Sequence, residues 1–172
     1  MTFEDDLAAE GEPEAEFHVG IAARQPMKRV AAGALFHDPQ GRIVMVEPIY
    51  KPTWEIPGGM CEKGEAPRDA CRREVAEEIG LATNVGRLLV VDWQPGHGVW
   101  GEIVVFVFDG GTLSEQHIDA VELQPDELRG LHRVALTDIR GRVRPSMYRR
   151  LSEADRAKRN GETLYLQFGR RA

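Results

Sequence analysis

Apolar and polar positions follow one another along the chain in short blocks, and these blocks predict strands separated by turns. The apolar runs Val30–Phe36 and Ile43–Pro48 flank a polar stretch that contains Pro39 and Gly41, which predicts two strands joined by a turn. Ile103–Phe108 is apolar at every position, which favours a strand buried on both faces.

Two segments have the spacing of helices. Within Ala66–Ile79, apolar residues recur every four positions, at Cys71, Val75 and Ile79, which predicts one apolar helix face. Gly80 is a plausible stop signal for this helix. Pro145–Arg159 is expected to be a second helix with proline in its first turn.

Further blocks complete the expected fold. Strands are predicted at Arg87–Trp93 and, more weakly, at Arg133–Leu136, and Thr163–Phe168 is expected to be a last edge strand. Gln124–Leu128 resembles the start of a helix or a turn. Strands interleaved with two helices predict an α/β sandwich, and the length of 172 residues suits one domain.

Charge is distributed unevenly. Of the 28 acidic residues, seven lie in residues 1–16, which leaves 21 against 22 lysines and arginines in the rest of the chain. We therefore expect residues 1–16 to be a disordered acidic tail, with a partner-binding arm as the alternative, and residues 17–172 to form the domain. The near-neutral remainder gives no support to nucleic-acid binding.

The composition favours a cytoplasmic protein. Cys61 and Cys71 make a poor disulfide framework and lack the spacing of a metal finger. Neither a signal sequence nor an apolar run of membrane-spanning length is expected.

Three carboxylates share one face of the first predicted helix. At 100° per residue, Glu74, Glu77 and Glu78 lie within about 100° of arc, where like charges destabilise a helix. One interpretation is a solvated acidic face in which Arg73 pairs with Glu77. The other is a site for a hard divalent cation such as Mg²⁺, which oxygen ligands bind.

The surrounding residues resemble a known motif. Residues 59–81 are similar to the Nudix box, G-x5-E-x7-R-E-U-x-E-E-x-G-U, in which U is a bulky aliphatic residue, and Trp54–Gly58 resembles the usual lead-in to that box. The fixed positions are filled by Gly59, Glu65, Arg73, Glu74, Val75, Glu77, Glu78, Gly80 and Leu81. The chain is therefore identified as a member of the Nudix hydrolase family on these residues.

The resemblance implies a mixed sheet between helices, a Nudix-type α/β/α sandwich, and a Mg²⁺ site with Mn²⁺ as an alternative. Glu74, Glu77 and Glu78 match the metal-binding glutamates, and the carbonyl of Gly58 or Gly59 is a plausible further ligand.

Two more box residues match supporting roles. Arg73 matches the arginine that orients the glutamates by ion pairing and so assists catalysis without contacting the reacting atoms. Glu65 matches the glutamate that supports the box from its own loop.

The implied reaction is attack of water on one phosphorus of a diphosphate. We expect Glu78 or Glu77 to share the general-base role with a glutamate from a later loop. Glu127 is favoured for this role because it comes just before a predicted strand. The candidates are Glu102, Glu115, Glu122 and Glu127.

The substrate is expected to be a small phosphorylated molecule. A nucleoside diphosphate derivative such as ADP-ribose or a nucleotide sugar is favoured, because Pro95 lies near the position of a proline associated with ADP-ribose hydrolases, although it is off that pattern. The alternatives are a nucleoside triphosphate pyrophosphohydrolase and a non-catalytic ligand-sensing module. Family members often pair, so a homodimer is a weak expectation.

Aromatic and basic residues outside the box have two interpretations each. Trp93 and Trp100 flank the loop Gln94–Gly101 and would suit base stacking, whereas burial is the ordinary role of tryptophan. A late basic cluster would suit phosphate recognition, whereas a solvated helix face with partners such as Asp155 is the commoner explanation. The cluster consists of Arg140, Arg142, Arg144, Arg149 and Arg150.

Overall fold

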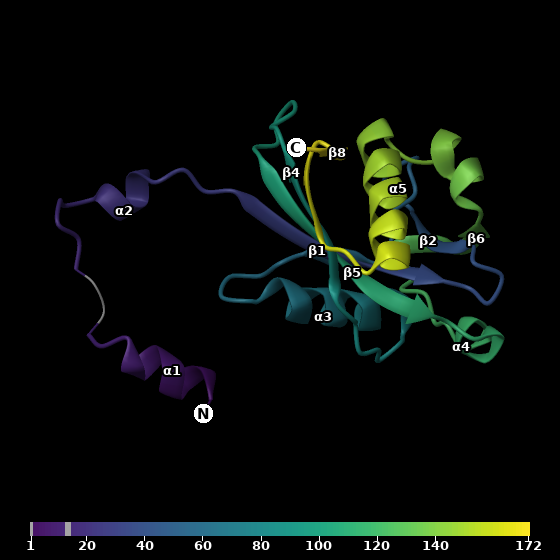
Figure 1. Cartoon of the computed structure of the whole chain (residues 1–172), viewed down its shortest axis with the longest axis horizontal. Coiled ribbons are helices and arrows are strands. Elements are labelled where there is room, and N and C mark those ends of the chain that lie inside the picture. The colour runs from purple at the N-terminus through teal and green to yellow at the C-terminus, as the bar shows by residue number, and fades with distance from the viewer. Residues whose placement is uncertain (1, 13–14) are drawn as a thin grey trace.

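The sheet is mixed and forms the centre of the molecule. The computed structural model describes residues 2–12 and 15–172 (Figure 1). In these residues the strands are β1 (Arg29–His37), β2 (Ile43–Pro48), β3 (Gly58–Met60), β4 (Leu88–Gln94), β5 (Ile103–Thr112), β6 (Leu128–Val134), β7 (Leu164–Gln167) and β8 (Arg170–Arg171). Their order is β6-β2-β1-β5-β4-β7-β8, and β3 pairs with β1. Strand β1 is parallel to β5 and antiparallel to β2 and β3.

A helix packs on each face of this sheet. Successive residues of a strand point to opposite faces, and accordingly Leu35 and Phe36 of β1 belong to two different apolar clusters. The cluster around Phe36 includes Val75 of α3 (Pro67–Ile79), and the cluster around Leu35 includes residues of α5 (Pro145–Asn160). Figure 1 shows α3 and α5 on opposite sides of the sheet. The predicted α/β/α sandwich is confirmed.

The helix that carries the box begins and ends where the sequence predicts. Pro67 occupies the first turn of α3, where a missing N–H costs no hydrogen bond. Gly80 ends the helix in the left-handed region with φ of 67°, which a side chain would disfavour. The helix is therefore fixed in length by residues on either side of the box glutamates.

The other helices are short apart from α5. They include α4 (Glu115–Asp119) and the 3₁₀ helix η1 (Leu136–Gly141), neither of which was predicted. Helix α5 has 16 residues, as expected from Pro145 onward. Within residues 2–12 and 15–172, no helix combines the length and the apolar character that a membrane crossing requires.

Three strand predictions need correction. The N-terminal half of β5 is only partly buried, because Ile103 and Val105 also line a cleft. The weak strand expected at Arg133–Leu136 lies earlier, as β6, and the chain turns into η1 after it. Strand β7 is not the edge, since β8 pairs with its outer side.

The N-terminal segment contains two short helices, α1 (Phe3–Ala9) and α2 (Ile21–Arg24). A helix at residues 3–9 differs from the disorder predicted for residues 1–16, and its local cause is a capping box between Thr2 and Asp5. Residues 4–12 are exposed, and Figure 1 shows α1 away from the sheet. Residues 1, 13 and 14 lie outside the described residues, so the tail and the domain boundary at residue 17 stay predictions.

Candidate active site

Glu78 lies at the junction between β3 and the last turn of α3. Its neighbour Ile79 is fully buried in the apolar cluster below the helix, which turns Glu78 inward beside the sheet. The backbone N–H of Gly58 donates a hydrogen bond to Glu78 Oε2 at 2.8 Å. Glu78 is only 8% exposed. Its buried carboxylate is therefore oriented by a backbone hydrogen-bond donor.

The two glycines beside Glu78 leave room that no other residue would. Gly58 has φ of 145°, and a Cβ there would lie 2.3 Å from the carbonyl oxygen of Ala32. A Cβ on Gly59 would lie 2.4 Å from the carboxyl carbon of Glu74. The absence of a side chain at Gly58 lets β3 approach β1 closely, and its absence at Gly59 lets the Glu74 carboxylate approach β3.

Arg73 connects the box loop to the box helix. Its guanidinium binds Glu65 through two hydrogen bonds of 2.9 Å each, from Nε and Nη2. Arg73 Nη1 donates to Glu74 Oε1 at 2.9 Å and to Glu77 Oε2 at 3.1 Å. Arg73 Nη2 also donates to the carbonyl of Met60 at 3.1 Å. One planar side chain therefore fixes three carboxylates and the end of β3.

Burial and ion pairing move the pKa values of these carboxyls in opposite directions. Burial raises the pKa of Glu78 to about 8, and the negative charges of Glu74 and Glu127 act in the same direction. Burial also raises the pKa of Glu74, against the opposing effect of Arg73. Hydrogen bonds from Arg73 hold the pKa of Glu65 down at about 2. The site thus combines two carboxyls that resist ionisation with one that is firmly ionised.

The residues fit a divalent cation that is held by a few carboxylates. Within the described residues, no three His, Cys, Asp or Glu side chains form a ready metal cage. Mg²⁺ does not need one, since one or two carboxylates with water and substrate phosphates suffice. The negative charge of Glu74 raises the pKa of Glu78, and the charges of Glu77 and Glu127 raise that of Glu74, a repulsion that a cation would offset.

The three predicted carboxylates do not share one environment. Glu78 is buried and Glu74 is partly buried, whereas the side chain of Glu77 is 54% exposed and its carboxylate is bound by Arg73. The predicted face of α3 is therefore divided by the depth of each residue in the fold, which angular position on a helix does not give. Whether Glu77 is a metal ligand stays a prediction.

Glu127 is a later glutamate that the fold brings within electrostatic reach of the box, and Glu122 lies beside Gly80 at the end of the box. The charge of Glu127 raises the pKa of both Glu74 and Glu78. Glu127 lies on the surface immediately before β6, and its backbone carbonyl accepts a hydrogen bond from the N–H of Ile49 at 2.8 Å. Two other candidates have partners elsewhere, because Glu102 pairs with Lys28 and Glu115 pairs with Arg133.

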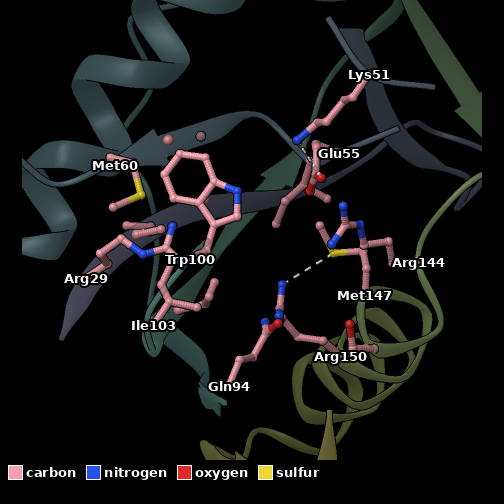
Figure 2. A pocket seen from close by; sticks show the side chains of 18 of the residues that line it. Arg29, Lys51, Glu55, Met60, Gln94, Trp100, Ile103, Arg144, Met147 and Arg150 are labelled. Carbon is pink, nitrogen blue, oxygen red and sulfur yellow. Dashed lines mark hydrogen bonds and ion pairs between the residues drawn. The ribbon is translucent and has the colours of Figure 1, made fainter. Parts of the chain in front are cut away.

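A cleft of about 740 Å³ opens beside Glu78, which is a size typical of small-molecule sites. Gly58, Gly59 and Glu78 form part of its wall. Figure 2 shows Trp100, Met60 and Arg29 on one side of this cleft and Lys51 and Arg144 on the other.

The three tryptophans have different environments. Trp100 lines the cleft, whereas Trp93 is not among its lining residues. Trp54 is buried and stacks on His132, with ring centroids 4.0 Å apart. Trp54 therefore has the ordinary buried role of tryptophan, whereas Trp100 is exposed to the cleft.

The basic cluster predicted late in the chain is dispersed in the fold. Arg144 and Arg150 line the cleft, and Arg150 pairs with the buried Asp92. Arg140 lies over the ring of Tyr148, Arg142 lies over Trp54, and Arg149 donates to the carbonyl of Phe168. The suggested partner Asp155 pairs instead with His37 and Arg159.

Two cleft residues were not predicted from the sequence. Glu55 lies in the lead-in to the box, and its charge contributes to the raised pKa of Glu78. Lys51 donates to Glu55 Oε1 at 2.8 Å. The lead-in itself was a usable signal for Glu55, but only the bridge between Val46 and Glu55 brings it to the cleft wall.

The two cysteines should differ sharply in reactivity. Burial raises the pKa of the fully buried Cys71 thiol to about 12, whereas Cys61 is partly exposed, although burial raises its pKa as well. The thiolate is the reactive form, so below pH 9 we expect a thiol reagent to label one cysteine in the native protein and two after unfolding. Cys61→Ser should abolish native labelling. Rapid labelling of two cysteines in the native protein would contradict the burial of Cys71.

Comparisons with known proteins agree with this geometry. The model of the NUDIX domain matches residues 27–154. A MutT-like protein of Streptomyces ambofaciens is 31% identical over 113 residues, which cover 62% of this chain and 71% of the relative. The ADP-ribose pyrophosphatase of Methanocaldococcus jannaschii is 36% identical over 90 residues, and the match spans 50% of this chain and about half, 53%, of that relative.

A solved structure gives the same fold. The MutT Nudix hydrolase from Burkholderia pseudomallei superposes with a TM-score of 0.61 and 25% sequence identity. The match covers 74% of this chain and 98% of that structure. The fold is therefore shared with an experimentally determined structure of a Nudix hydrolase.

Proposed function

Because the chain belongs to the Nudix hydrolase family, we propose that it uses a divalent cation to hydrolyse the diphosphate linkage of a nucleoside diphosphate derivative. ADP-ribose and nucleotide sugars are the favoured substrates, and Mg²⁺ is the favoured cation, with Mn²⁺ as the alternative. The observation that carries the proposal is the buried Glu78, held by Gly58 in the wall of a cleft large enough for such a substrate.

Glu74 and Glu78 would hold the cation, with Glu77 and the carbonyl of Gly58 or Gly59 as further ligands. When bound, the cation would neutralise phosphate charge and lower the pKa of water. Arg73 keeps the carboxylate of Glu74 oriented and so acts as a positioning residue. Lys51 and Arg144, across the cleft from Trp100, supply positive charge to the phosphates of the substrate.

Proton removal from the attacking water is assigned to Glu127 together with a box glutamate. Glu127 is exposed, and its charge reaches both Glu74 and Glu78. An exposed carboxylate within electrostatic reach of the box glutamates can accept a proton from water and can release it to solvent. General-base assistance of this kind contributes about 10²–10⁴-fold to a rate.

Alanine at Glu127 is expected to lower kcat by roughly 10²-fold or more, while the thermal unfolding temperature stays near that of the wild type. The reason for retained stability is that the Glu127 side chain is exposed. Steady-state kinetics with thermal unfolding measures both quantities. Glu115→Ala is the matched control. Glu115 pairs with Arg133, outside the box, so this variant should retain the kcat of the wild type. Wild-type kcat in Glu127→Ala would remove this residue from the mechanism.

The experiment that tests the function is a substrate panel. Purified protein is incubated with ADP-ribose, nucleotide sugars and nucleoside triphosphates, with and without Mg²⁺, and the released phosphate and nucleotides are identified. Cation-dependent cleavage of the diphosphate derivatives is the expected result. Preferential release of pyrophosphate from triphosphates would favour the alternative pyrophosphohydrolase.

A non-catalytic ligand-sensing module is the remaining alternative. Such a module would bind members of the panel without cleaving any of them. Relatives of this chain are named for different substrates, including ADP-ribose pyrophosphatase and RNA pyrophosphohydrolase, so their names alone do not decide the substrate. The cytoplasmic location and a homodimer stay predictions.

A further inference from the structure

Trp100 lies at the tip of the connection between β4 and β5. His97 N–H donates to the carbonyl of Trp100 at 2.9 Å, and Trp100 N–H donates back to the carbonyl of His97 at 3.2 Å. These two hydrogen bonds close the tip into a tight turn. Its indole ring is thereby carried on a short hairpin and projects over the cleft (Figure 2).

The base of this tip is tied to the start of β1. Arg29 Nη2 donates to the carbonyl of Gly101 at 2.8 Å, and Arg29 N–H donates to the carbonyl of Glu102 at 3.1 Å. Lys28 forms an ion pair with the Glu102 carboxylate. The hairpin is therefore braced from the neighbouring strand, which positions Trp100 before any ligand arrives.

The guanidinium of Arg29 covers one face of the Trp100 indole. The Arg29 Cζ atom lies 5.0 Å from the ring centroid, which is within the range of a cation–π contact. Trp100 nevertheless remains 64% exposed. A large aromatic ring that is held on one side and open on the other is suited to stacking against a planar ligand.

The cleft changes in character along its length. Trp100, Met60 and Ile103 are on the side that Figure 2 shows to the left, where the cationic Arg29 lies against the indole of Trp100; Lys51 and Arg144 are on the right, with Glu55 beside Lys51. Gly58, Gly59 and Glu78 also line this cleft. A ligand with an aromatic group at one end and a phosphate group at the other would therefore place the aromatic group by Trp100 and the phosphate group by Lys51 and Arg144. Its diphosphate would then lie by the box glycines.

We propose that Trp100 is the nucleobase-binding residue of the cleft: the base of the substrate stacks on the indole face that Arg29 leaves open. The proposal rests on the function proposed above and makes it more specific. The substrate class is one that carries an aromatic base, so a diphosphate of a sugar without a base is a poor substrate. Arg29 acts through Trp100 as a positioning residue.

Binding without any metal tests the stacking directly. AMP is the probe, and ribose 5-phosphate is the matched probe without a base. AMP is expected to quench the tryptophan fluorescence of the wild type, whereas ribose 5-phosphate leaves it unchanged. Because Trp100→Ala removes base–aromatic stacking, it should weaken AMP binding roughly 5- to 150-fold, measured as Kd by calorimetry. Trp100→Phe should keep the Kd within a few-fold while it loses the quenching.

A control variant separates stacking from disturbance of the loop. Val99 also lines the cleft and is 92% exposed, so Val99→Ala changes the same tip without removing the ring. It should bind AMP as the wild type does. The proposal is overturned if AMP does not quench the wild type, if Trp100→Ala binds AMP normally, or if Val99→Ala weakens AMP binding as much as Trp100→Ala does.

Kinetics distinguishes failure of this inference from failure of the proposed function. Trp100→Ala should raise KM for ADP-ribose and leave kcat within a few-fold, since the ring does not contact the diphosphate. Wild-type cleavage of ADP-ribose with an unchanged KM in Trp100→Ala would overturn the role of Trp100 and keep the hydrolase. AMP binding that depends on Trp100 without turnover of any panel member would keep the base site and overturn the hydrolase.

Discussion

Replacing Glu78 by glutamine is expected to reduce turnover of the substrate by roughly 10²–10⁴-fold, the range in which a positioned carboxylate contributes to catalysis. Glutamine keeps the shape of the side chain and one acceptor for the Gly58 N–H, but it cannot carry the negative charge that a divalent cation needs. The measurement is kcat at saturating Mg²⁺ and substrate. The variant should fold, because burial already opposes the charge of Glu78 and raises its pKa to about 8.

A matched control lies on the same helix. The side chain of Asp69 in α3 is 64% exposed. Within the described residues its one salt bridge is with Arg72, at 3.5 Å. Asp69→Asn removes one negative charge from α3 at a distance from the cleft and should retain wild-type kcat. The mechanism fails if Glu78→Gln turns over substrate as fast as Asp69→Asn.

Removing the carboxylate of Asp92 is expected to lower the free energy of unfolding by about 3–5 kcal/mol, because a buried charge would lose its partner. Asp92 Oδ2 accepts a hydrogen bond from Arg150 Nε at 2.7 Å, and the two side chains are 0% and 6% exposed. Asp92 Oδ1 also accepts from the Gly169 N–H at 2.9 Å. Asp92→Ala should therefore lower Tm by about 6–20 °C in a domain of this size.

A double-mutant cycle separates the ion pair from general loss of packing. Thermal and urea unfolding are measured for Asp92→Ala, Arg150→Met and the double variant. The double variant should lose less stability than the two single variants together, because neither charge is then left alone in the interior. Lys28→Ala, which removes an exposed ion pair with Glu102, should change the stability by less than about 1 kcal/mol. Strict additivity of the two single changes would contradict the pairing.

The box helix shows how far the sequence alone could be taken. Apolar residues at intervals of four, together with Gly80 after them, were enough to predict α3 to within a residue at its start, and its end was predicted correctly. The pairing of Arg73 with box glutamates, which the resemblance implied, is present as hydrogen bonds to Glu74 and Glu77. These features depend on spacing within one segment, and helix geometry converts such spacing into position.

The cleft could not be predicted in the same way. Residues from β1, β5 and α5 line it with the box, and these elements are far apart in sequence. The even apolar run at Ile103–Phe108 gave no sign that Ile103 would line a cleft. Burial on both faces is therefore confirmed only for Val107 and Phe108, which belong to the two apolar clusters, and it is incomplete earlier in the strand, because residues are covered only where another element packs over them.

The sequence by itself determined the family, the α/β/α class, the extent of α3 and the glutamates that α3 carries. Only the tertiary structure decided that Glu78 is buried, that Glu77 is exposed and that Glu127 lies within electrostatic reach of the site. It also placed Trp100 in the cleft and divided the arginine cluster between the cleft and other contacts. The physical reason is that local spacing sets which residues share a helix face, whereas depth and long-range proximity depend on how the sheet brings distant segments together.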